Sequence, residues 1–221
     1  MIAATAVVPV KEIAAAKQRL APVLDTDLRR ALALAMLADV LDALAAGPSL
    51  PVVVATVDPE AMEVASGFGA SVSRADAVLG HSEAVSAAAR ALAREGRAML
   101  TLPADIPLVA AKDIARILGA AEDGAKFVIV PARDGLGSNA VLCNPADIVP
   151  LSFGGASCHR NCAAARARGL TPRTLVLPRV GLDLDTGDDL ADFVAIPSCT
   201  RARALLQRHG IARALAAEAQ A

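Results

Sequence analysis

Apolar residues follow two alternating patterns along the chain. Short runs rich in Val and Ala, bounded by charged residues or Pro, are typical of strands buried on both faces of a sheet. Longer stretches between them repeat apolar residues every three or four positions, which is typical of amphipathic helices. We predict strands over residues 3–10, 51–57, 97–105 and 126–132, a further strand over 69–75, and helices over 59–68, 82–95 and 111–123.

One more helix is delimited on both sides. Asp25 or Thr26 is suited to cap its N-terminus, and Gly47-Pro48 ends it. An apolar residue recurs every four positions in between. The apolar stripe comprises Leu28, Leu32, Met36, Val40 and Leu44. Off the stripe lie Arg29, Arg30, Asp39 and Asp42.

The pattern changes in the C-terminal part of the chain. Residues 133–145 contain two Gly and predict a turn or hairpin, and a short helix is expected over 156–168. Residues 173–177 and 180–185 resemble strands. From about residue 197 the chain is Ala-rich and predicts a helical tail.

Strands that alternate with helices indicate an α/β fold with a mostly parallel sheet and helices on both faces. No linker or repeat divides the chain, so we expect a single domain over residues 1–221. In open sheets of this class the ligand site lies at the carboxyl ends of the strands. Candidate chemistry is therefore sought directly after each apolar strand.

Composition excludes several classes of protein. The 221 residues are 55% hydrophobic and carry a net charge of −1, which excludes a mostly disordered chain and gives no attraction for DNA or acidic membranes. Trp and Tyr, which stack on single-stranded nucleic acid, are absent. The apolar N-terminal run is too short to span a membrane and lacks the basic start of a signal peptide. We expect a cytoplasmic protein that has neither nucleic acid nor membrane as a partner.

Three cations follow the first strand. Lys11, Lys17 and Arg19 fall in a predicted loop with small residues between them. Lys supplies a point charge and Arg a bidentate fork, which together suit a phosphate chain. The glycine-rich motifs of P-loop and Rossmann dinucleotide sites are absent. The alternative is an ordinary solvated helix face.

Three carboxylates follow other strands. Asp105 lies between two prolines, and Asp183 and Asp185 are two residues apart, so that an extended chain would point both to one side. Carboxylates at strand ends suit Mg²⁺, which takes oxygen ligands and substrate phosphates. The alternative for Asp185 and Thr186 is a helix cap. Together with the cations, the carboxylates predict a site for a nucleoside triphosphate and magnesium.

The motifs that carry these residues resemble a known family. In order they read VPVK, AKQRLAP, LPADIPL, PARDGLGSNAVL, FGGAS and LDLDTGDDL. Over residues 5 to about 195 the chain is similar to the CofC/FbiD guanylyltransferases of coenzyme F420 biosynthesis, relatives of the MobA-like nucleotidyltransferases. The resemblance implies a Rossmann-like three-layer sandwich of the nucleotide-diphospho-sugar transferase type with a small β-hairpin insertion. It also implies transfer of GMP from GTP to 2-phospho-L-lactate, phosphoenolpyruvate or 3-phosphoglycerate, with release of pyrophosphate.

The resemblance also implies roles for individual residues. Lys11, Lys17 and Arg19 would hold the GTP phosphates, and Lys11, Lys17 and Asp105 would be catalytic. Asp105, Asp183 and Asp185 would bind Mg²⁺, with Mn²⁺ as a substitute. The remaining nucleotide-binding positions would be Gly80, Ser82 and Asn139. The acceptor-binding positions would be Ser138, Gly154, Gly155 and Ser157.

Two departures from the family pattern leave the substrates open. His81 and Ser82 stand where the family usually has Leu and Asn, in the nucleotide pocket. In the acceptor loop Ala156 replaces Gly, Cys158 replaces Phe and Asn161 replaces His. The alternatives are a nucleotidyltransferase with another nucleotide or acceptor, and a degenerate nucleotide-binding protein. A homodimer and the role of the C-terminal tail also stay open.

Two of the four cysteines lie close together in sequence. Cys158 and Cys162 are one helical turn apart, with His159 beside the first. A zinc site needs about four ligands in two clusters, and the second cluster is missing. Disulfides are not expected in a chain without an export signal. The role of these residues is left open.

Overall fold

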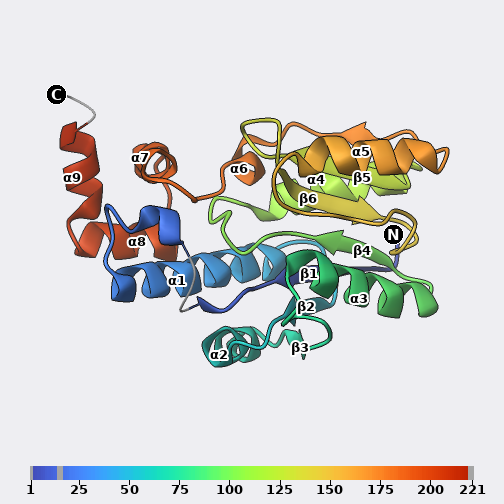
Figure 1. Ribbon diagram of the computed structural model, residues 1–221, viewed down its shortest axis with the longest axis horizontal. Coiled ribbons are helices and arrows are strands. Elements are labelled where there is room, and N and C mark those ends of the chain that lie inside the picture. The colour runs from blue at the N-terminus through green and yellow to red at the C-terminus, as the bar shows by residue number, and fades with distance from the viewer. Residues whose placement is uncertain (1, 14–16, 219–221) are drawn as a thin grey trace.

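The strands of the computed structural model form one sheet. Within residues 2–13 and 17–218, which the structure describes, seven strands lie in the order β3-β2-β1-β4-β6-β5-β7 (Figure 1). All neighbouring pairs are parallel except those of β6, which runs antiparallel to both β4 and β5. The strands are β1 (Ala4–Pro9), β2 (Val52–Ala55), β3 (Ser71–Ser73), β4 (Ala98–Thr101), β5 (Phe127–Pro131), β6 (Ser138–Cys143) and β7 (Arg173–Thr174).

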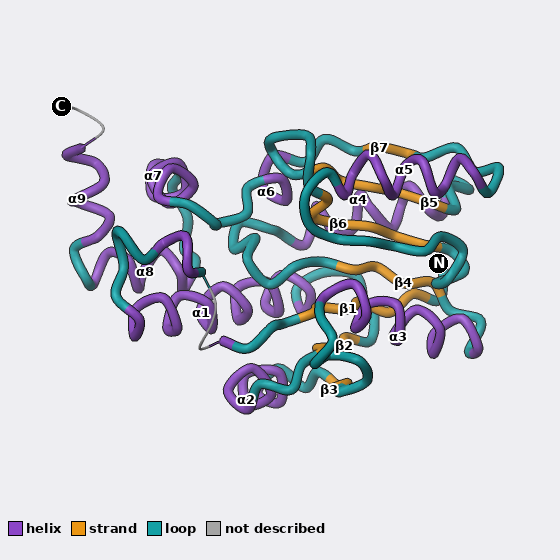
Figure 2. The backbone as a smooth tube through the Cα atoms, in the orientation of Figure 1, coloured by secondary structure: helices purple, strands orange, loops and turns teal. Residues whose placement is uncertain are grey.

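Helices cover both faces of the sheet, as Figure 2 shows. One core joins the sheet to α1, α2 and α4, and a second core on the opposite face joins it to α3 and α5. The alternation is visible within β1, where Ala6 and Val8 enter the first core and Val7 the second. These helices are α1 (Thr26–Ala45), α2 (Pro59–Gly67), α3 (His81–Arg94), α4 (Ala111–Glu122) and α5 (Ser157–Ala167). The predicted α/β class, with a mostly parallel sheet between helical layers, is confirmed.

Local signals set the N-termini of α1 and α2. The Asp25 carboxylate accepts the Leu28 N–H at 2.8 Å and caps α1, and Pro59 occupies the first turn of α2. Asp58 caps α2 and also accepts the Ile13 N–H at 2.9 Å, so it holds the loop after β1. Asp58, one of the acids found after a strand, therefore has a structural role.

The predicted hairpin over residues 133–145 is part of the central sheet. Residues 133–137 form a turn, and β6 then returns antiparallel and is inserted between β4 and β5. Every residue of β6 is buried. The turn therefore lies between the carboxyl end of β5 and the start of β6.

The strand predicted over residues 180–185 is wrong. Pro178 begins a short helix, α6 (Pro178–Gly181), because its fixed φ suits a first helical turn. The chain is extended afterwards but joins no strand, and the Leu184 N–H donates to the Asp105 carbonyl at 3.0 Å. The strand predicted over 173–177 is shorter than expected, since β7 has two residues.

The C-terminal tail packs on the rest of the protein. Helices α7 (Gly187–Ala195), α8 (Arg201–Arg208) and α9 (Ile211–Glu218) form a third core with the N-terminal half of α1. Met36, Leu205 and Leu206 are buried in it. In the part of the chain that the structure describes, none of the helices combines the length and apolar character needed to cross a membrane.

Candidate active site

Two adjoining cavities open at the carboxyl ends of β1, β4 and β5. The larger has a volume of about 770 Å³ and lies beneath the turn over 133–137 and the loops over 153–157 and 181–189. The other, of about 710 Å³, lies beside the loop after β1. The residues that line both cavities are Lys11, Gly80, His81, Pro103, Asp105 and Asp185. Every site residue predicted from the sequence lines one or both of them.

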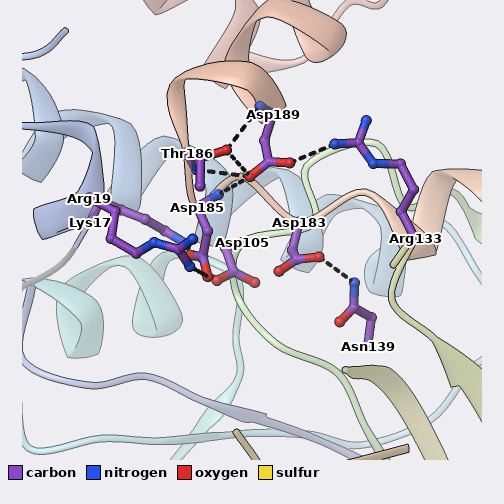
Figure 3. Close-up of polar contacts among 9 residues, drawn as sticks. All are labelled: Lys17, Arg19, Asp105, Arg133, Asn139, Asp183, Asp185, Thr186 and Asp189. Atoms are coloured by element: carbon purple, nitrogen blue, oxygen red, sulfur yellow. Dashed lines mark hydrogen bonds and ion pairs between the residues drawn. The ribbon is translucent and has the colours of Figure 1, made fainter. Parts of the chain in front are cut away.

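A buried cation lies between two carboxylates at the centre of the site. Lys17 Nζ is 2.6 Å from Asp105 Oδ2 and 2.7 Å from Asp185 Oδ1 (Figure 3). The Lys17 side chain is 8% exposed and its φ of 56° is left-handed. Burial alone would lower the pKa of Lys17, but the charges and hydrogen bonds of Asp105 and Asp185 outweigh it and raise the pKa. The ammonium group therefore stays charged and neutralises the carboxylates.

The two other predicted phosphate-binding cations are more exposed. Arg19 Nη1 lies 3.8 Å from Asp185 Oδ2, and its side chain is 70% exposed. Lys11 is exposed and lines both cavities. The structure thus brings all three cations to the same part of the site. Lys17 contacts the two carboxylates, whereas Lys11 and Arg19 are exposed.

Asp183 is held by Asn139. The Asn139 amide donates to Asp183 Oδ1 at 2.9 Å and to the Val180 carbonyl at 3.0 Å (Figure 3). Burial raises the pKa of Asp183, and the charges of Asp105 and Asp185 add to this, whereas the Asn139 hydrogen bond lowers it. Asn139, a predicted nucleotide-binding residue, therefore also orients one of the predicted metal-binding carboxylates.

The predicted acceptor residues line the far wall of the larger cavity. Ser138 Oγ lies 2.8 Å from Ser157 Oγ, and the Asn161 amide donates to Ser138 Oγ at 3.3 Å. Gly154 and Gly155 both have positive φ, which a side chain would strain. They give the loop before α5 its sharp turn beside the cavity.

The start of α3 is tied to this acceptor loop. The Ser82 hydroxyl accepts the Phe153 N–H at 3.0 Å, and the His81 and Phe153 rings are 4.4 Å apart. The pKa of His81 is lowered to about 4, chiefly by burial; the charges of Asp105 and Glu83 oppose this, and the charge of Lys11 adds to it. His81 is therefore a neutral ring in the wall shared by the two cavities. No role was predicted for Phe153, because a single aromatic residue has no characteristic sequence spacing from the residues that it contacts.

Arg133 and two carboxylates form a second charged group at the site. Arg133 lines the larger cavity and pairs with Asp189, Nη2 to Oδ1 at 2.8 Å, and with Asp192. Arg133 follows β5, and Asp189 lies in the first turn of α7.

The donor set fits a hard cation. Asp105 and Asp185 already share one buried cation, and Mg²⁺ is usually held by one or two carboxylates with waters and substrate phosphates. Among the described residues, no group of three or more His, Cys, Asp or Glu side chains is placed to hold a metal by itself. Cys158 and Cys162 are buried and free, and burial raises the pKa of the Cys158 thiol.

Comparisons with known proteins agree with this geometry. A family model described as guanylyl transferase CofC like matches residues 4–219. Phosphoenolpyruvate guanylyltransferase from Rubrobacter xylanophilus is 39% identical over 190 residues, covering 86% of this chain and 93% of that protein. 2-Phospho-L-lactate guanylyltransferase from Methanothermobacter thermautotrophicus is 32% identical, covering 92% and 89%. 3-Phospho-D-glycerate guanylyltransferase from Colwellia psychrerythraea is 33% identical, covering 83% and 88%.

A solved structure shares the fold. A protein from Desulfovibrio desulfuricans G20, attributed to the nucleotide-diphospho-sugar transferases, superposes with a TM-score of 0.79. The match covers 97% of this chain and 99% of that one at 18% identity. At that identity the likeness concerns the fold alone.

Proposed function

The chain belongs to the CofC-like guanylyl transferase family, and from that premise we propose that it transfers GMP from GTP to a phosphorylated three-carbon acid. The products are a guanosine diphosphate diester and pyrophosphate, and the pathway is that of coenzyme F420, as the resemblance of the motifs implies. The proposed metal is Mg²⁺, with Mn²⁺ as a substitute. GTP and small phosphorylated acids are metabolites of the cytoplasm, where we place the enzyme.

The observation that carries the proposal is the cation between two carboxylates at the mouth of a large cavity. Attack of an acceptor phosphate on the α-phosphorus of GTP joins two anions, so their repulsion must be offset. Lys11, Lys17 and Arg19 supply three positive charges at that point. The acceptor is already an anion, so the reaction needs no strong general base. The lowered pKa of His81, about 4, is consistent with this, because so weakly basic a ring is a poor proton acceptor at pH 7.

Asp105, Asp183 and Asp185 would hold the metal. Mg²⁺ supplies charge stabilisation on the transferred and leaving oxygens when bound. Asn139 holds Asp183 through a hydrogen bond, and Lys17 lies between the other two carboxylates in the structure. Because Lys17 occupies the space between Asp105 and Asp185, we propose that it leaves them for the GTP phosphates when the metal binds.

The substrates would divide between the two walls. We assign Gly80 and Ser82 at the start of α3 to the nucleotide, together with Asn139. We assign the acceptor to the serine pair Ser138 and Ser157 and the loop of Gly154 and Gly155.

Phosphoenolpyruvate is the first acceptor to test. Proteins named for this acid are up to 41% identical to this chain, against 32% and 33% for the relatives named for the other two acids. The acceptor wall departs from the family pattern at Ala156, Cys158 and Asn161. The Asn161 side chain is buried and donates a hydrogen bond to Ser138 Oγ. A changed wall changes selectivity through a few polar and steric contacts.

The test is pyrophosphate release by the purified protein with Mg²⁺. GTP, ATP, CTP and UTP are each paired with phosphoenolpyruvate, 2-phospholactate and 3-phosphoglycerate. We expect turnover with GTP and one acid, and a loss of about 100-fold or more in Asp105→Asn, because a carboxylate that would hold the charge-stabilising metal is removed. Asp147→Asn is the matched control, since Asp147 is exposed and lines neither cavity. Turnover with another nucleotide would favour the alternative of a related transferase, and nucleotide binding without any turnover would favour a binding protein.

A further inference from the structure

Both oxygens of the Asp189 carboxylate contact loops of the site. Oδ2 accepts the Asp185 N–H at 3.2 Å, the Thr186 N–H at 2.8 Å and the Thr186 hydroxyl at 2.7 Å. Oδ1 accepts Arg133 Nη2 at 2.8 Å (Figure 3). The Asp189 side chain is 17% exposed. It therefore joins the start of α7, the main chain of Asp185 and the turn after β5.

A helix cap accounts for only part of these contacts. A capping box needs the carboxylate to accept from the N-cap residue, which is Thr186 here. The bonds to the Asp185 N–H and to Arg133 are additional. The first fixes the peptide from which the Asp185 side chain reaches Lys17. The second fixes a residue of the turn after β5.

Arg133 connects Asp189 to the turn over 133–137. Its own N–H donates to the Gly181 carbonyl at 2.8 Å, and its guanidinium contacts Asp192 as well as Asp189. Two carboxylates neutralise its charge, so it is poorly suited to bind a substrate anion. The turn leads directly into Ser138 and Asn139. Arg133 thus connects α7 with the residues that line the acceptor wall and hold Asp183.

We propose that Asp189 is a positioning residue for the metal-binding carboxylates. It fixes the main chain of Asp185 directly, and through Arg133 it fixes the turn that carries Asn139 and so Asp183. The inference rests on the proposed function, because it assumes that Asp183 and Asp185 take a metal. Loss of partners that orient metal ligands costs about 10–100-fold in metal affinity or activity.

Asp189→Asn separates the contact with Arg133 from the contacts of Oδ2. The amide oxygen still accepts from Asp185 and Thr186, whereas the amide group cannot pair with Arg133. We expect Mn²⁺ titrated alone, followed by electron paramagnetic resonance, to bind about tenfold more weakly. We expect kcat to fall by a similar factor with little change in the KM for GTP, and the melting temperature to stay close to that of the unaltered protein.

Two further variants make the test decisive. Asp188→Asn changes the same charge in the same helical turn, but Asp188 is exposed, so Mn²⁺ affinity and kcat should not change. Asp189→Glu keeps the capping box and the stability, since Glu suits that position. Its displaced carboxylate should leave Mn²⁺ affinity and kcat low.

Each result decides one claim. Asp189→Asn behaving like Asp188→Asn, or a rise confined to the acceptor KM in Arg133→Gln, would overturn the part assigned to Arg133. Unchanged activity and Mn²⁺ affinity in Asp189→Glu would overturn the direct positioning of Asp185. Absence of turnover and Mn²⁺ binding in the unaltered protein would contradict the proposed function itself.

Discussion

Individual side chains of the site often have a contact that their sequence motif did not indicate. The spacing of Asp183 and Asp185 predicted two carboxylates facing one cavity, and both line it. The motifs could not show that Asn139 contacts Asp183 or that Ser82 contacts Phe153, because these partners are 44 and 71 residues apart. The sequence therefore predicted which residues gather at the site better than which residues they touch.

The Lys17→Met variant tests the exchange between ammonium and metal. We expect turnover to fall by about 100-fold or more, because a charge on the phosphates is lost. We also expect Mn²⁺ alone to bind several-fold more tightly, since no ammonium group has to leave Asp105 and Asp185. Lys112→Met, at an exposed position of α4, is the control for loss of one charge. Weaker Mn²⁺ binding in Lys17→Met would show that Lys17 does not compete with the metal.

The neutral state of His81 predicts a pH dependence of stability. Its pKa is lowered from 6.5 to about 4 in the folded protein, chiefly by burial. As the pH falls from 6.5 toward 4 the unfolded chain takes up the proton first, so the free energy of unfolding decreases. His81→Gln should lack this part of the decrease in urea unfolding at pH 7.5 and pH 5. His159→Gln, at an exposed position, should retain it, and identical pH profiles of the two variants would contradict the prediction.

At the scale of the elements, α1 is buried on more sides than its apolar stripe indicates. Arg29 and Asp39 lie off the stripe, yet their exposures are 8% and 6%. The tail helices cover this side of α1, and a single helical period cannot show a partner that lies about 160 residues later in the chain. The Asp39 carboxylate accepts the N–H groups of Arg201 and Ala202 at 2.7 and 2.9 Å, so α1 caps α8.

Removing this cap should loosen the tail. We expect Asp39→Ala to lower the free energy of unfolding by about 2 kcal/mol, because the cap is lost and buried N–H groups lose their acceptor. Asp42→Ala removes an exposed partner of Arg201 one turn away and should cost no more than about 1 kcal/mol. Far-UV circular dichroism follows the urea titration, since the chain has no Trp or Tyr. Equal losses in both variants would contradict the role of the cap.

At the scale of the whole molecule, the alternation of strands and helices predicted the fold class and the edge of the sheet that carries the site. It could not predict the place of β6, because antiparallel insertion between β4 and β5 depends on pairing between strands. Nor could it exclude a strand over 180–185, since buried extended residues such as Leu182 and Leu184 give the same pattern whether or not they pair.

The single domain predicted over residues 1–221 can be tested by calorimetry. We expect one cooperative transition, because one sheet and the tail on α1 connect all parts of the chain that the structure describes. GTP with Mg²⁺ at about 100 times its dissociation constant should move this transition upward as a whole, by about 5–10 °C. A second transition that GTP leaves in place would indicate an independent unit.

The long separation between Lys17 and its two carboxylates has a consequence for how the enzyme is made. The partners lie 88 and 168 residues apart. At about 5–20 residues per second, Asp185 is synthesised roughly ten to thirty seconds after Lys17. A nascent chain that ends before residue 183 therefore carries the cations and Asp105 but lacks Asp183 and Asp185. We expect such a chain not to consume GTP.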